Sequence, residues 1–443
     1  MTNSIIDVDK IINKALSLGV NEVEVYIASG KRLSIDAIKD RIEYVNYVHK
    51  VGLGLRVVIG KKVACYGASI TKPEEANKVI ERAIKIAKAS SEDKYWISLP
   101  KRLGKSVVEG VYDSRVESIS SEEAISIVKN CIDTVKNYDK RVSPVEMSLT
   151  IATGEFTIGN CYSETVSRKD SRVIFAIEVK ARENGREGVY HDSSYSKRLD
   201  VESYNDVALK SAIKALENVK AKPIETVKTS VIFEGKVFAS IVASALVPAV
   251  TADNVQQNRS PLKGKLGQQI LSETLTLIDD PYYPWLFESK EFDDEGVATK
   301  RNIIVRSGVL ETYVYDTYTA LREGRESTGN AYKPGLSSAP RPWIHNLIID
   351  GGSGVKLEDM IKDTKHGILV SSTIGYWLSN PVSGYVTATI THGYLIRDGS
   401  IVDYVKGVII SDNIYDMLKG RIELFGTPKE RILSKRLYTT SKD

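Results

Sequence analysis

The sequence is poor in the residues that bind transition metals or form disulfides. Its 443 residues include three cysteines, Cys65, Cys131 and Cys161, and five histidines. The cysteines are odd in number, widely spaced and free of any Cys-x-x-Cys pair, which argues against a disulfide framework and a zinc knuckle and fits a reducing compartment. No two histidines lie within one helical turn, and no cysteine follows residue 161. The second half of the chain therefore has no thiolate to complete a histidine and cysteine metal site.

The chain also lacks a strong excess of charge of either sign. Its 61 basic and 57 acidic residues are mixed along the sequence and leave a net charge of +4. Such a balance implies no strong field of one sign, so nucleic acid is not the expected partner. The most basic stretch is the tail Thr427–Asp443, in which Lys429, Arg431, Lys435 and Arg436 are interpreted as a solvated end of the chain.

Long apolar runs are missing as well. The longest charge-free apolar run lies between Lys236 and Asp253, and it is shorter than the roughly 20 apolar residues of a membrane-spanning helix. The run is rich in small residues and predicts a buried helix, which Pro248 is expected to kink or break. Charges also interrupt residues Met1–Leu18, so no signal peptide is predicted and the expected location is the cytoplasm.

What the sequence does contain predicts a folded protein of more than one domain. Its composition, 42% hydrophobic and 27% charged, is that of a globular protein, and its length exceeds the roughly 250 residues at which single cores stop growing. The polar segment ending at Pro223 suggests a boundary. We expect an α+β fold with an N-terminal domain over residues 1–223, built of helices layered on antiparallel strands, with subregions of about 1–110 and 111–223. Residues 224–443 are predicted to form a mostly antiparallel, β-rich domain around the buried apolar helix.

Local patterns predict several elements within these domains. Apolar spacing predicts a helix over Asp7–Leu18, and alternation predicts a meander of strands over Glu22–Ser69. Small and polar residues suggest turns at Ala28–Gly30 and Ile59–Lys61. Capping-box spacing predicts helix starts at Thr71–Glu74 and at Ser120–Glu123. Glycines predict two later hairpin turns, at Gly308 and at Asp398–Gly399.

No catalytic constellation emerges from these patterns. The acidic groups Asp279–Asp280 and Asp293–Glu295 are better explained as turn residues, because they lack the spacing of a calcium loop and precede Pro281 and Gly296. Ser353, in a Gly-Gly-Ser-Gly turn, lacks the context of a nucleophile or a Walker loop. The segment Glu326–Asn346 is too long for an ordinary connection, and its aromatic residues suggest an ordered, functional loop.

The order of motifs along the chain is informative where single motifs are not. The following segments succeed one another: EVEVYIASGKRLSIDAIKDRIEYV, VGLGLRVVIGKKVACYGAS, SPLKGKLGQQI, FDDEGVATKRNIIVRSGVLETYVYD, ESTGNAYKP, NLIIDGG, GILV and TATITHGYLIRDGSIVDYVKG. In this order and spacing the chain resembles the TldD/PmbA family, also called modulators of DNA gyrase, and specifically its PmbA (TldE) branch.

The resemblance implies where a metal site belongs and that it is absent. In the TldD branch, the helix before the S-x-x-x-GKLG segment carries H-E-x-x-x-H, and a late cysteine joins the two histidines. Counting back from Ser260 and Gly264–Gly267 places the three motif positions on Ala243, Ser244 and Pro248. None of these can bind a metal as histidine does, and the late cysteine is missing too. No catalytic or metal-binding residue is therefore carried over to this chain.

The family resemblance further implies a division of labour. TldD and TldE chains form an unequal pair that degrades unfolded or short peptides, and zinc is expected in the TldD-type partner. The present chain is then expected to be a non-catalytic subunit in a heterodimer, binding extended peptide by strand addition. Whether the isolated chain is a monomer or a homodimer stays open. Candidate groove or interface residues are Ser327, Gly329, Asn330 and Arg341, with a purely loop-shaping role as the alternative.

Two other functions are kept as alternatives. The first is a self-sufficient peptide hydrolase with a site rebuilt from Asp293, Asp294 and either His345 or His392. The second is a DNA-associated regulatory protein, suggested by the historical family name and the basic tail. The even charge balance speaks against this second alternative.

Overall fold

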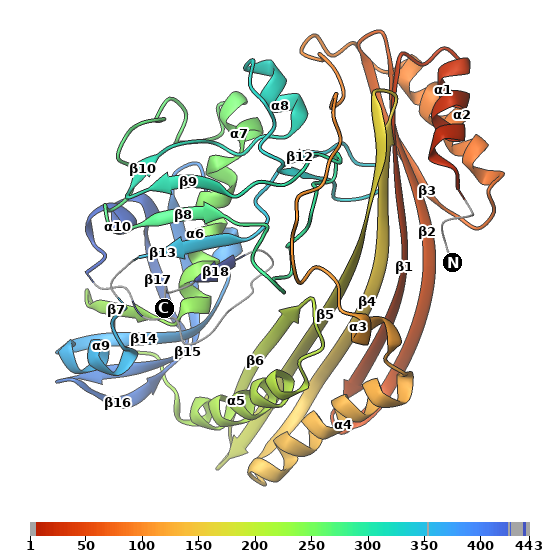
Figure 1. Cartoon of the computed structure of the whole chain (residues 1–443). Helices are drawn as coiled ribbons and strands as arrows, with labels where there is room; N and C mark the ends of the chain where they lie inside the picture. The colour runs from red at the N-terminus through yellow and green to blue at the C-terminus, as the bar shows by residue number, and fades with distance from the viewer. Residues whose placement is uncertain (1–5, 352–353, 424–425, 427–436, 440–443) are drawn as a thin grey trace.

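The computed structural model describes residues 6–351, 354–423, 426 and 437–439. Ser353 and the basic residues Lys429, Arg431, Lys435 and Arg436 lie outside the described residues. The fold is mixed α+β with largely antiparallel sheets, as predicted. Figure 1 shows a large curved sheet on one side of the molecule and a second body of smaller sheets and helices on the other.

One antiparallel sheet of six long strands dominates the first half of the chain. Its order is β3-β2-β1-β4-β5-β6. The strands are β1 (Glu22–Ile38), β2 (Arg41–Ile59), β3 (Lys62–Ile70), β4 (Val142–Asn160), β5 (Ser163–Glu183) and β6 (Arg186–Ser196). β1 and β4 pair from Glu24 with Asn160 to Ile38 with Glu146, so the predicted subregions 1–110 and 111–223 share one continuous sheet. The proposed domain boundaries themselves stay predictions.

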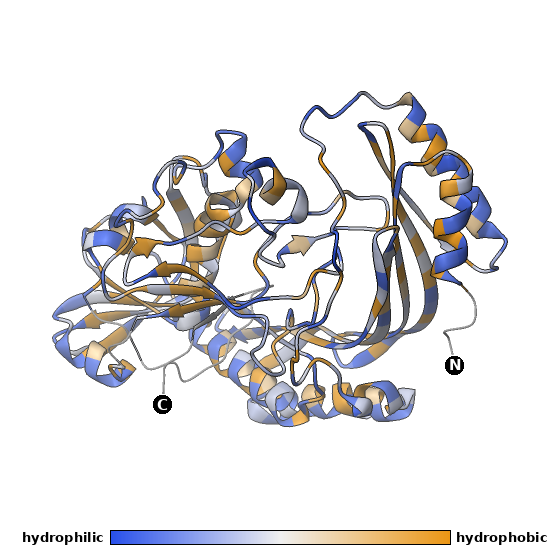
Figure 2. Ribbon diagram, turned by 45° about the horizontal axis from the view of Figure 1, so that its top comes forward, coloured by the Kyte–Doolittle hydropathy of each residue, from blue (hydrophilic) through white to orange (hydrophobic). Residues whose placement is uncertain are grey.

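Helices cover one face of this sheet. Odd-numbered residues of β1 face these helices. Val23 and Val25 belong to the apolar cluster under α1 (Val8–Ser17) and α2 (Glu75–Ala89). Leu33, Ile35 and Ala37 belong to the cluster under α4 (Ser121–Tyr138) and α5 (Val201–Lys220). A short helix, α3 (Ser114–Ser118), precedes α4. Orange and blue segments alternate along these helices in Figure 2, as expected of amphipathic helices that bury one side.

The described strands of the second half form two five-stranded sheets and the small pair β11-β12. One has the order β10-β9-β8-β13-β18, and the other has the path β16-β15-β14-β7, with β17 also paired to β15. The strands are β7 (Ser230–Phe233), β8 (Thr276–Asp279), β9 (Asn302–Arg306), β10 (Val309–Leu310), β11 (Ala331–Tyr332), β12 (Arg341–Pro342), β13 (Leu347–Asp350), β14 (His366–Ile374), β15 (Tyr385–Arg397), β16 (Ser400–Val405), β17 (Val408–Asn413) and β18 (Leu437–Thr439). The helices are α6 (Gly235–Val250), α7 (Ala252–Gln256), α8 (Thr317–Arg322), α9 (Leu357–Asp363), the 3₁₀ turn η1 (Tyr376–Leu378) and α10 (Ile414–Gly420).

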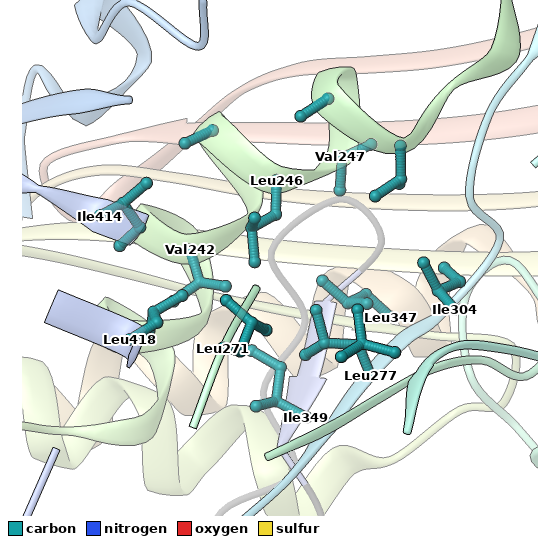
Figure 3. Packing of buried hydrophobic residues seen from close by; sticks show 14 of the residues in the cluster. Val242, Leu246, Val247, Leu271, Leu277, Ile304, Leu347, Ile349, Ile414 and Leu418 are labelled. Atoms are coloured by element: carbon teal, nitrogen blue, oxygen red, sulfur yellow. The ribbon is translucent and has the colours of Figure 1, made fainter. Parts of the chain in front are cut away.

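The apolar run of the sequence forms α6, at the centre of the second half. Val242 and Leu246 pack among residues of both sheets and of α10, including Leu277, Ile349 and Leu418 (Figure 3). Pro248 lies inside the helix, which ends two residues later at Val250 and resumes as α7 after Thr251. The predicted break therefore occurs just after the proline. Within the described residues, no helix has the length and apolarity to cross a membrane.

Most of the local patterns predicted their elements. Asp7 caps α1 through Lys10 N, Ser120 and Glu123 form the predicted capping box of α4, and both glycine hairpins are present. The turn predicted at Ala28–Gly30 is wrong, because β1 continues through it, paired on both sides to β2 and β4. The box predicted at Thr71–Glu74 is also wrong. Glu75, one residue later, accepts the N–H groups of Thr71 and Lys72 instead.

A loop from the second half reaches across to the large sheet. Leu336, between β11 and β12, packs on Gly52 and Gly54 of β2 and on Gly67 of β3, where a Cβ atom would meet Leu336 within 2.7 Å. Ser337 Oγ hydrogen-bonds to both N and O of Gly67, each at 3.0 Å. The three glycines thus provide the shallow surface that this contact needs.

Candidate functional site: a helix without ligands and a charged junction

The first candidate region is the C-terminal half of α6, where the resemblance places the family's metal motif. From Ala239 to Val250 every residue is buried except Ala243, Ser244 and Pro248, which are half-buried. These three positions are the more exposed ones in this part of the helix, and we call them the open side of α6, although Ala243 also packs against the apolar core.

The residues present on this open side do not fit a metal ion. Ala243 and Pro248 carry no donor atom, and Ser244 Oγ donates to the carbonyl of Ile241 at 2.7 Å. Across the described residues, no three histidine, cysteine, aspartate or glutamate side chains gather in a metal-binding group. The residues outside the described part contain neither histidine nor cysteine. The donor set of a histidine-based zinc site is thus missing from this helix.

The second candidate region is a hollow of about 1920 Å³ beside the first turns of α6. It runs along β7 and β17 and is lined by apolar side chains such as Phe233, Phe238 and Ile410, with Lys214 and Glu234 among its polar residues. β7 is the last strand of its sheet in the described part of the chain. The hollow therefore has an open strand edge at its margin.

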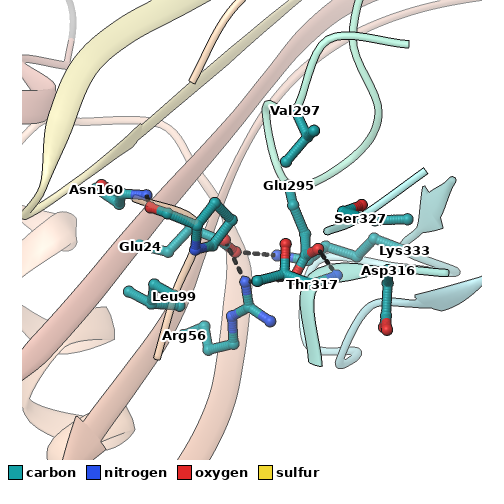
Figure 4. Close-up of polar contacts among 12 residues, drawn as sticks. Glu24, Arg56, Leu99, Asn160, Glu295, Val297, Asp316, Thr317, Ser327 and Lys333 are labelled. Atoms are coloured by element: carbon teal, nitrogen blue, oxygen red, sulfur yellow. Dashed lines mark hydrogen bonds and ion pairs between the residues drawn. The ribbon is translucent and has the colours of Figure 1, made fainter. Parts of the chain in front are cut away.

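The third region is a buried, charged junction between the two halves. We define the junction by Glu24, Arg56, Arg168, Asp170 and Arg172 of the large sheet, with Glu288, Lys290, Asp294, Glu295 and Lys333 of the second half. At its centre Arg56 Nη2 contacts Glu24 and lies 2.8 Å from Glu295 Oε1, while Lys333 Nζ lies 3.3 Å from Glu24 Oε1 (Figure 4). Glu24 and Glu295 are fully buried. Buried charges of this kind are tolerated only when paired, so the junction ties the two halves together.

A second group of charges extends the junction along β5. Asp170 contacts Lys197 and lies 3.3 Å from both Arg168 and Arg172. Burial alone would raise the pKa of Asp170, but these cations hold it well below the ordinary value. Burial lowers the pKa of Lys197 to about 8, against the attraction of Asp170. Arg168 and Arg172 also face Asp294 and Glu288 from the second half.

The acidic residues interpreted as turn punctuation are buried parts of this architecture. Asp293 accepts the N–H groups of Glu295, Val297 and Ala331, and burial together with the charge of Glu295 raises its pKa well above the ordinary value. Asp279 accepts from the backbone of His345 and Asn346, and burial raises its pKa to about 7. The turn interpretation is therefore incomplete, because a run of acids in sequence gave no sign of the partners that bury them.

Asp316 is a further titratable group that the sequence did not single out. It caps α8, and its Oδ1 accepts from Thr319 N at 2.8 Å and from Thr319 Oγ1 at 2.6 Å. Burial, followed by the negative charge of Glu295, raises its pKa to about 7. The pattern Asp-x-x-Thr signals the helix cap but not the nearby carboxylate.

In the rebuilt hydrolase site, each histidine is hydrogen-bonded to a group other than Asp293 or Asp294. His392 Nε2 lies 3.0 Å from Glu217 Oε2 of α5, and its ring packs against Tyr190 and Tyr394. His345 Nε2 lies 2.7 Å from the carbonyl of Gly329, and burial lowers its pKa to about 3. Asp294 is engaged by Lys290 and by the backbone N–H of Lys333.

The four predicted groove or interface residues have different surroundings. Asn330 is fully buried, with Nδ2 donating to Asp279 and to the carbonyl of Trp343, and Gly329 is buried beside it at a φ of 73°. Ser327 is half-buried and donates to Tyr315, whereas Arg341 is exposed beside Tyr332 and Trp343. None of the four lines the hollow. Gly329 and Asn330 thus shape the loop from inside, and a role of any of the four in binding stays a prediction.

Comparison with solved structures places the fold among proteins named after TldE and DNA gyrase modulators. TldE from Thermococcus kodakarensis superposes with a TM-score of 0.87 at 24% identity, covering 95% of this chain and 94% of that one. A putative modulator of DNA gyrase from Thermotoga maritima superposes with a TM-score of 0.81 at 24% identity, covering 97% and 96%. At these identities the similarity shows the shared fold.

Sequence comparison then gives the family. Models of the PmbA/TldA metallopeptidase domain 1, central domain and C-terminal domain match residues 23–87, 114–219 and 226–435. The chain belongs to the PmbA/TldD metallopeptidase family, as predicted. Its relatives include a metalloprotease of Methanocaldococcus jannaschii, 28% identical over 92% of this chain and 90% of the relative, and metalloprotease PmbA of Escherichia coli O157:H7, 24% identical over 92% and 89%.

Proposed function

We propose that this chain is the metal-free, non-catalytic subunit of a heteromeric peptidase whose TldD-type partner holds zinc. The observation that carries the proposal is the open side of α6, where Ala243, Ser244 and Pro248 occupy the positions of the family's metal motif. The helix retains its buried support, yet its outward positions supply no imidazole or carboxylate. Loss of the ligands on a retained scaffold is what a non-catalytic family member should display.

The hollow beside α6 supports a role in holding peptide. It combines apolar lining from Phe233, Phe238 and Ile241 with the edge of β7, which pairs with β14 alone among the described strands. An extended peptide can add to such an edge through main-chain hydrogen bonds, while apolar pockets receive alternate side chains. This mode selects for extended conformation more than for sequence, as expected for a subunit of a complex that degrades unfolded peptides.

Purification of the chain from its native cell tests the proposal. We expect a TldD-type paralogue to co-purify, to be identified by mass spectrometry, and to carry zinc. Cleavage of an unstructured peptide should require the partner, and the repurified chain alone should hold no stoichiometric zinc. Cleavage by the chain alone that survives extensive repurification would refute the proposal in favour of a self-sufficient hydrolase. Steep, salt-dependent binding of duplex DNA would favour the regulatory alternative.

A restoration experiment addresses the same helix directly. The triple substitution Ala243→His, Ser244→Glu and Pro248→His rebuilds the motif, but the late cysteine and the groups that orient metal-bound histidines remain absent. We expect the triple variant to bind zinc weakly and to show no turnover, as measured by metal analysis after dialysis and by peptide cleavage. Tight zinc binding with turnover would show that the rest of a catalytic site is present after all.

A further inference from the structure

The hollow beside α6 has a charged end that both halves of the chain build. Lys210 and Lys214, one turn apart on α5, line this end together with Glu234, the residue between β7 and α6. α5 packs on the large sheet, whereas β7 and α6 belong to the second half. Cavities between two folded bodies are common places for ligands, and a few placed polar groups give them specificity. The charged end can therefore recognise one particular group of a ligand.

Lys214 is held in place by the second half. Its side chain is 8% exposed, and its Nζ lies 2.7 Å from Glu234 Oε1 and contacts Ser371 Oγ. Ser371 also contacts Glu234. The pairing of β14 with β15 skips Ser371, so this serine is the extra residue of a β-bulge. Bulges redirect side chains and are frequent beside functional sites. The ammonium group of Lys214 thus has a fixed position at the margin of the hollow.

Positive charge exceeds negative charge at this end of the hollow. The described lining there has two lysines and one carboxylate, and Lys210 Nζ lies 3.7 Å from Glu234 Oε2. Nearby, Lys236 and Asp192 contact each other, so this pair adds no net charge. Glu217 does not line the hollow, because its carboxylate is hydrogen-bonded to a histidine and a tyrosine of β15. A ligand group placed between the two lysines is therefore favoured if it is an anion.

The direction of β7 decides which end of an added peptide reaches the lysines. Glu234 N donates to the carbonyl of Val370 on β14 at 2.9 Å. Backbone groups alternate in direction along a strand, so Val231 and Phe233 turn theirs away from β14, and both residues line the hollow. A peptide that runs parallel to β7, as β14 does, ends beside Glu234 with its C-terminal carboxylate. An antiparallel peptide would bring its amino group there, which is a third cation.

We propose that the hollow binds extended peptides by their free C-terminal carboxylate, which Lys210 and Lys214 receive, with the peptide parallel to β7. This inference rests on the proposed role of the hollow in holding peptide and names the class of peptide that it takes. Fragments and chain ends carry such a carboxylate, whereas an internal segment of a long chain has only a neutral amide at the same place. The subunit would thus select released peptides over intact chains.

Binding of two peptides that differ in one group tests the proposal. The probe is an acetylated peptide of alternating valine and threonine residues, with a free carboxylate or with a terminal amide, titrated calorimetrically into the full chain. The amide should raise the dissociation constant on the order of tenfold, because it loses a charge-assisted hydrogen bond. Lys210→Met should weaken binding of the carboxylate peptide to the level of the amide peptide and leave the amide peptide unchanged.

The matched control is Lys220→Met, which removes an exposed lysine at the end of the same helix, outside the lining of the hollow. It should change the affinity of neither peptide. Lys210 is preferred to Lys214 for the test, because loss of Lys214 would leave the buried Glu234 and Ser371 without their shared partner. A variant of Lys214 that failed to fold would give no binding to compare.

Photo-cross-linking reads the direction of the peptide without relying on affinity. A benzophenone on the amino-terminal residue of the carboxylate peptide should label the segment around Lys365 and His366, which lines the hollow near the start of β7. A benzophenone on the carboxyl-terminal residue should label α5 near Lys210. The labelled segments are identified by mass spectrometry after digestion. The reverse pattern would overturn the proposal, because it would place the amino group at the lysines.

The outcomes separate this inference from the proposed function. Equal affinities for the two peptides, or a difference that Lys210→Met leaves intact, would overturn the carboxylate site while the metal-free assignment stood. Failure of both peptides to bind would overturn the carboxylate site and the role of the hollow together. Stoichiometric zinc in the chain and cleavage without a partner would refute the proposed function, even if the free carboxylate and Lys210 still governed binding.

Discussion

The surroundings of α6 and the charged junction differ in the kind of side chain that they bury. α6 lies among apolar side chains, and its three outward positions hold no ionisable group. The junction gathers arginines, lysines and carboxylates that, apart from the partly exposed Arg172, are almost fully removed from water. In this chain, buried ionisable residues are concentrated where the halves meet rather than on the open side of α6. Buried charge here is explained by assembly of the chain, so perturbed pKa values alone do not locate a catalytic site.

The largest loss of stability is expected when Arg56, the central cation of the junction, is removed. Arg56→Ala leaves Glu24 and Glu295 buried without their shared guanidinium. We expect a loss of roughly 3–5 kcal/mol in the free energy of unfolding, measured by chemical denaturation of the full chain. Arg182→Ala removes an exposed arginine that pairs with Glu187 and should cost less than about 1 kcal/mol. A loss for Arg56→Ala no larger than that of Arg182→Ala would contradict the role given to the junction.

A truncation in the apolar core measures how much the packing around α6 contributes to stability. Leu246→Ala opens a cavity where α6 packs against both sheets (Figure 3). The expected loss is roughly 2–4 kcal/mol, again from the denaturation midpoint and slope. Leu378→Ala, at a leucine that is 80% exposed, should change stability little. Equal effects of the two truncations would mean that α6 is not the centre of the core.

The pH dependence of Asp316 tests the electrostatics of the junction. Because its pKa is raised to about 7 in the folded chain, the folded state binds more protons than the unfolded state between about pH 4 and 7, and stability from this group falls as pH rises through that window. Asp316→Asn keeps an acceptor for Thr319 but removes the titration. Its stability relative to wild type should therefore rise by roughly 1–3 kcal/mol between pH 4 and pH 8.

The control for this prediction is Asp133→Asn, at an exposed aspartate of α4. It should show no such trend in a series of denaturation curves at matched ionic strength. If the difference between Asp316→Asn and wild type stayed constant with pH, Asp316 would be titrating normally in the folded chain.

The smallest effect is expected at Pro248. Alanine at this position restores an N–H group that can donate to the carbonyl of Ser244, but α6 continues for only two residues beyond it. We expect a gain of about 1 kcal/mol rather than the full helix-interior penalty of proline, about 3 kcal/mol. Pro223→Ala, at an exposed proline between α5 and β7, is the matched control. A destabilised Pro248→Ala would show that the break after α6 depends on the proline ring.

Local patterns predicted those elements whose determinants are local. Asp7, Ser120 and the glycine at position 308 act on backbone within a few residues, so their caps and turns were readable. The long strand β1 overrode the turn signal at Ala28–Gly30, because Gly30 is paired with Lys50 and with Gly154, which lie far along the chain. The residues next to Gly30 in the sequence give no information about these strand partners.

Of the candidate site regions, the positions on α6 were located from the sequence, whereas the junction was not. The family resemblance located Ala243, Ser244 and Pro248, and the structure places all three on one open side of α6. The junction was missed because Glu24, Arg56 and Glu295 come from three distant segments, and because the acidic group that contains Glu295 was interpreted as a turn. Asn330 was a candidate groove or interface residue because it lies in the long loop, but its amide is bound to Asp279 in the interior.

The seat of Leu336 on Gly52, Gly54 and Gly67 has a consequence for biosynthesis. The glycines are translated early and their cover late, since about 270 residues separate Ser337 from Gly67. On the ribosome, the large sheet can form from neighbouring hairpins while this patch still faces water. A chain stalled or cleaved before residue 336 would therefore leave the surface at Gly52, Gly54 and Gly67 exposed. Chaperones and proteases could distinguish such an incomplete chain from the complete one by this exposed surface.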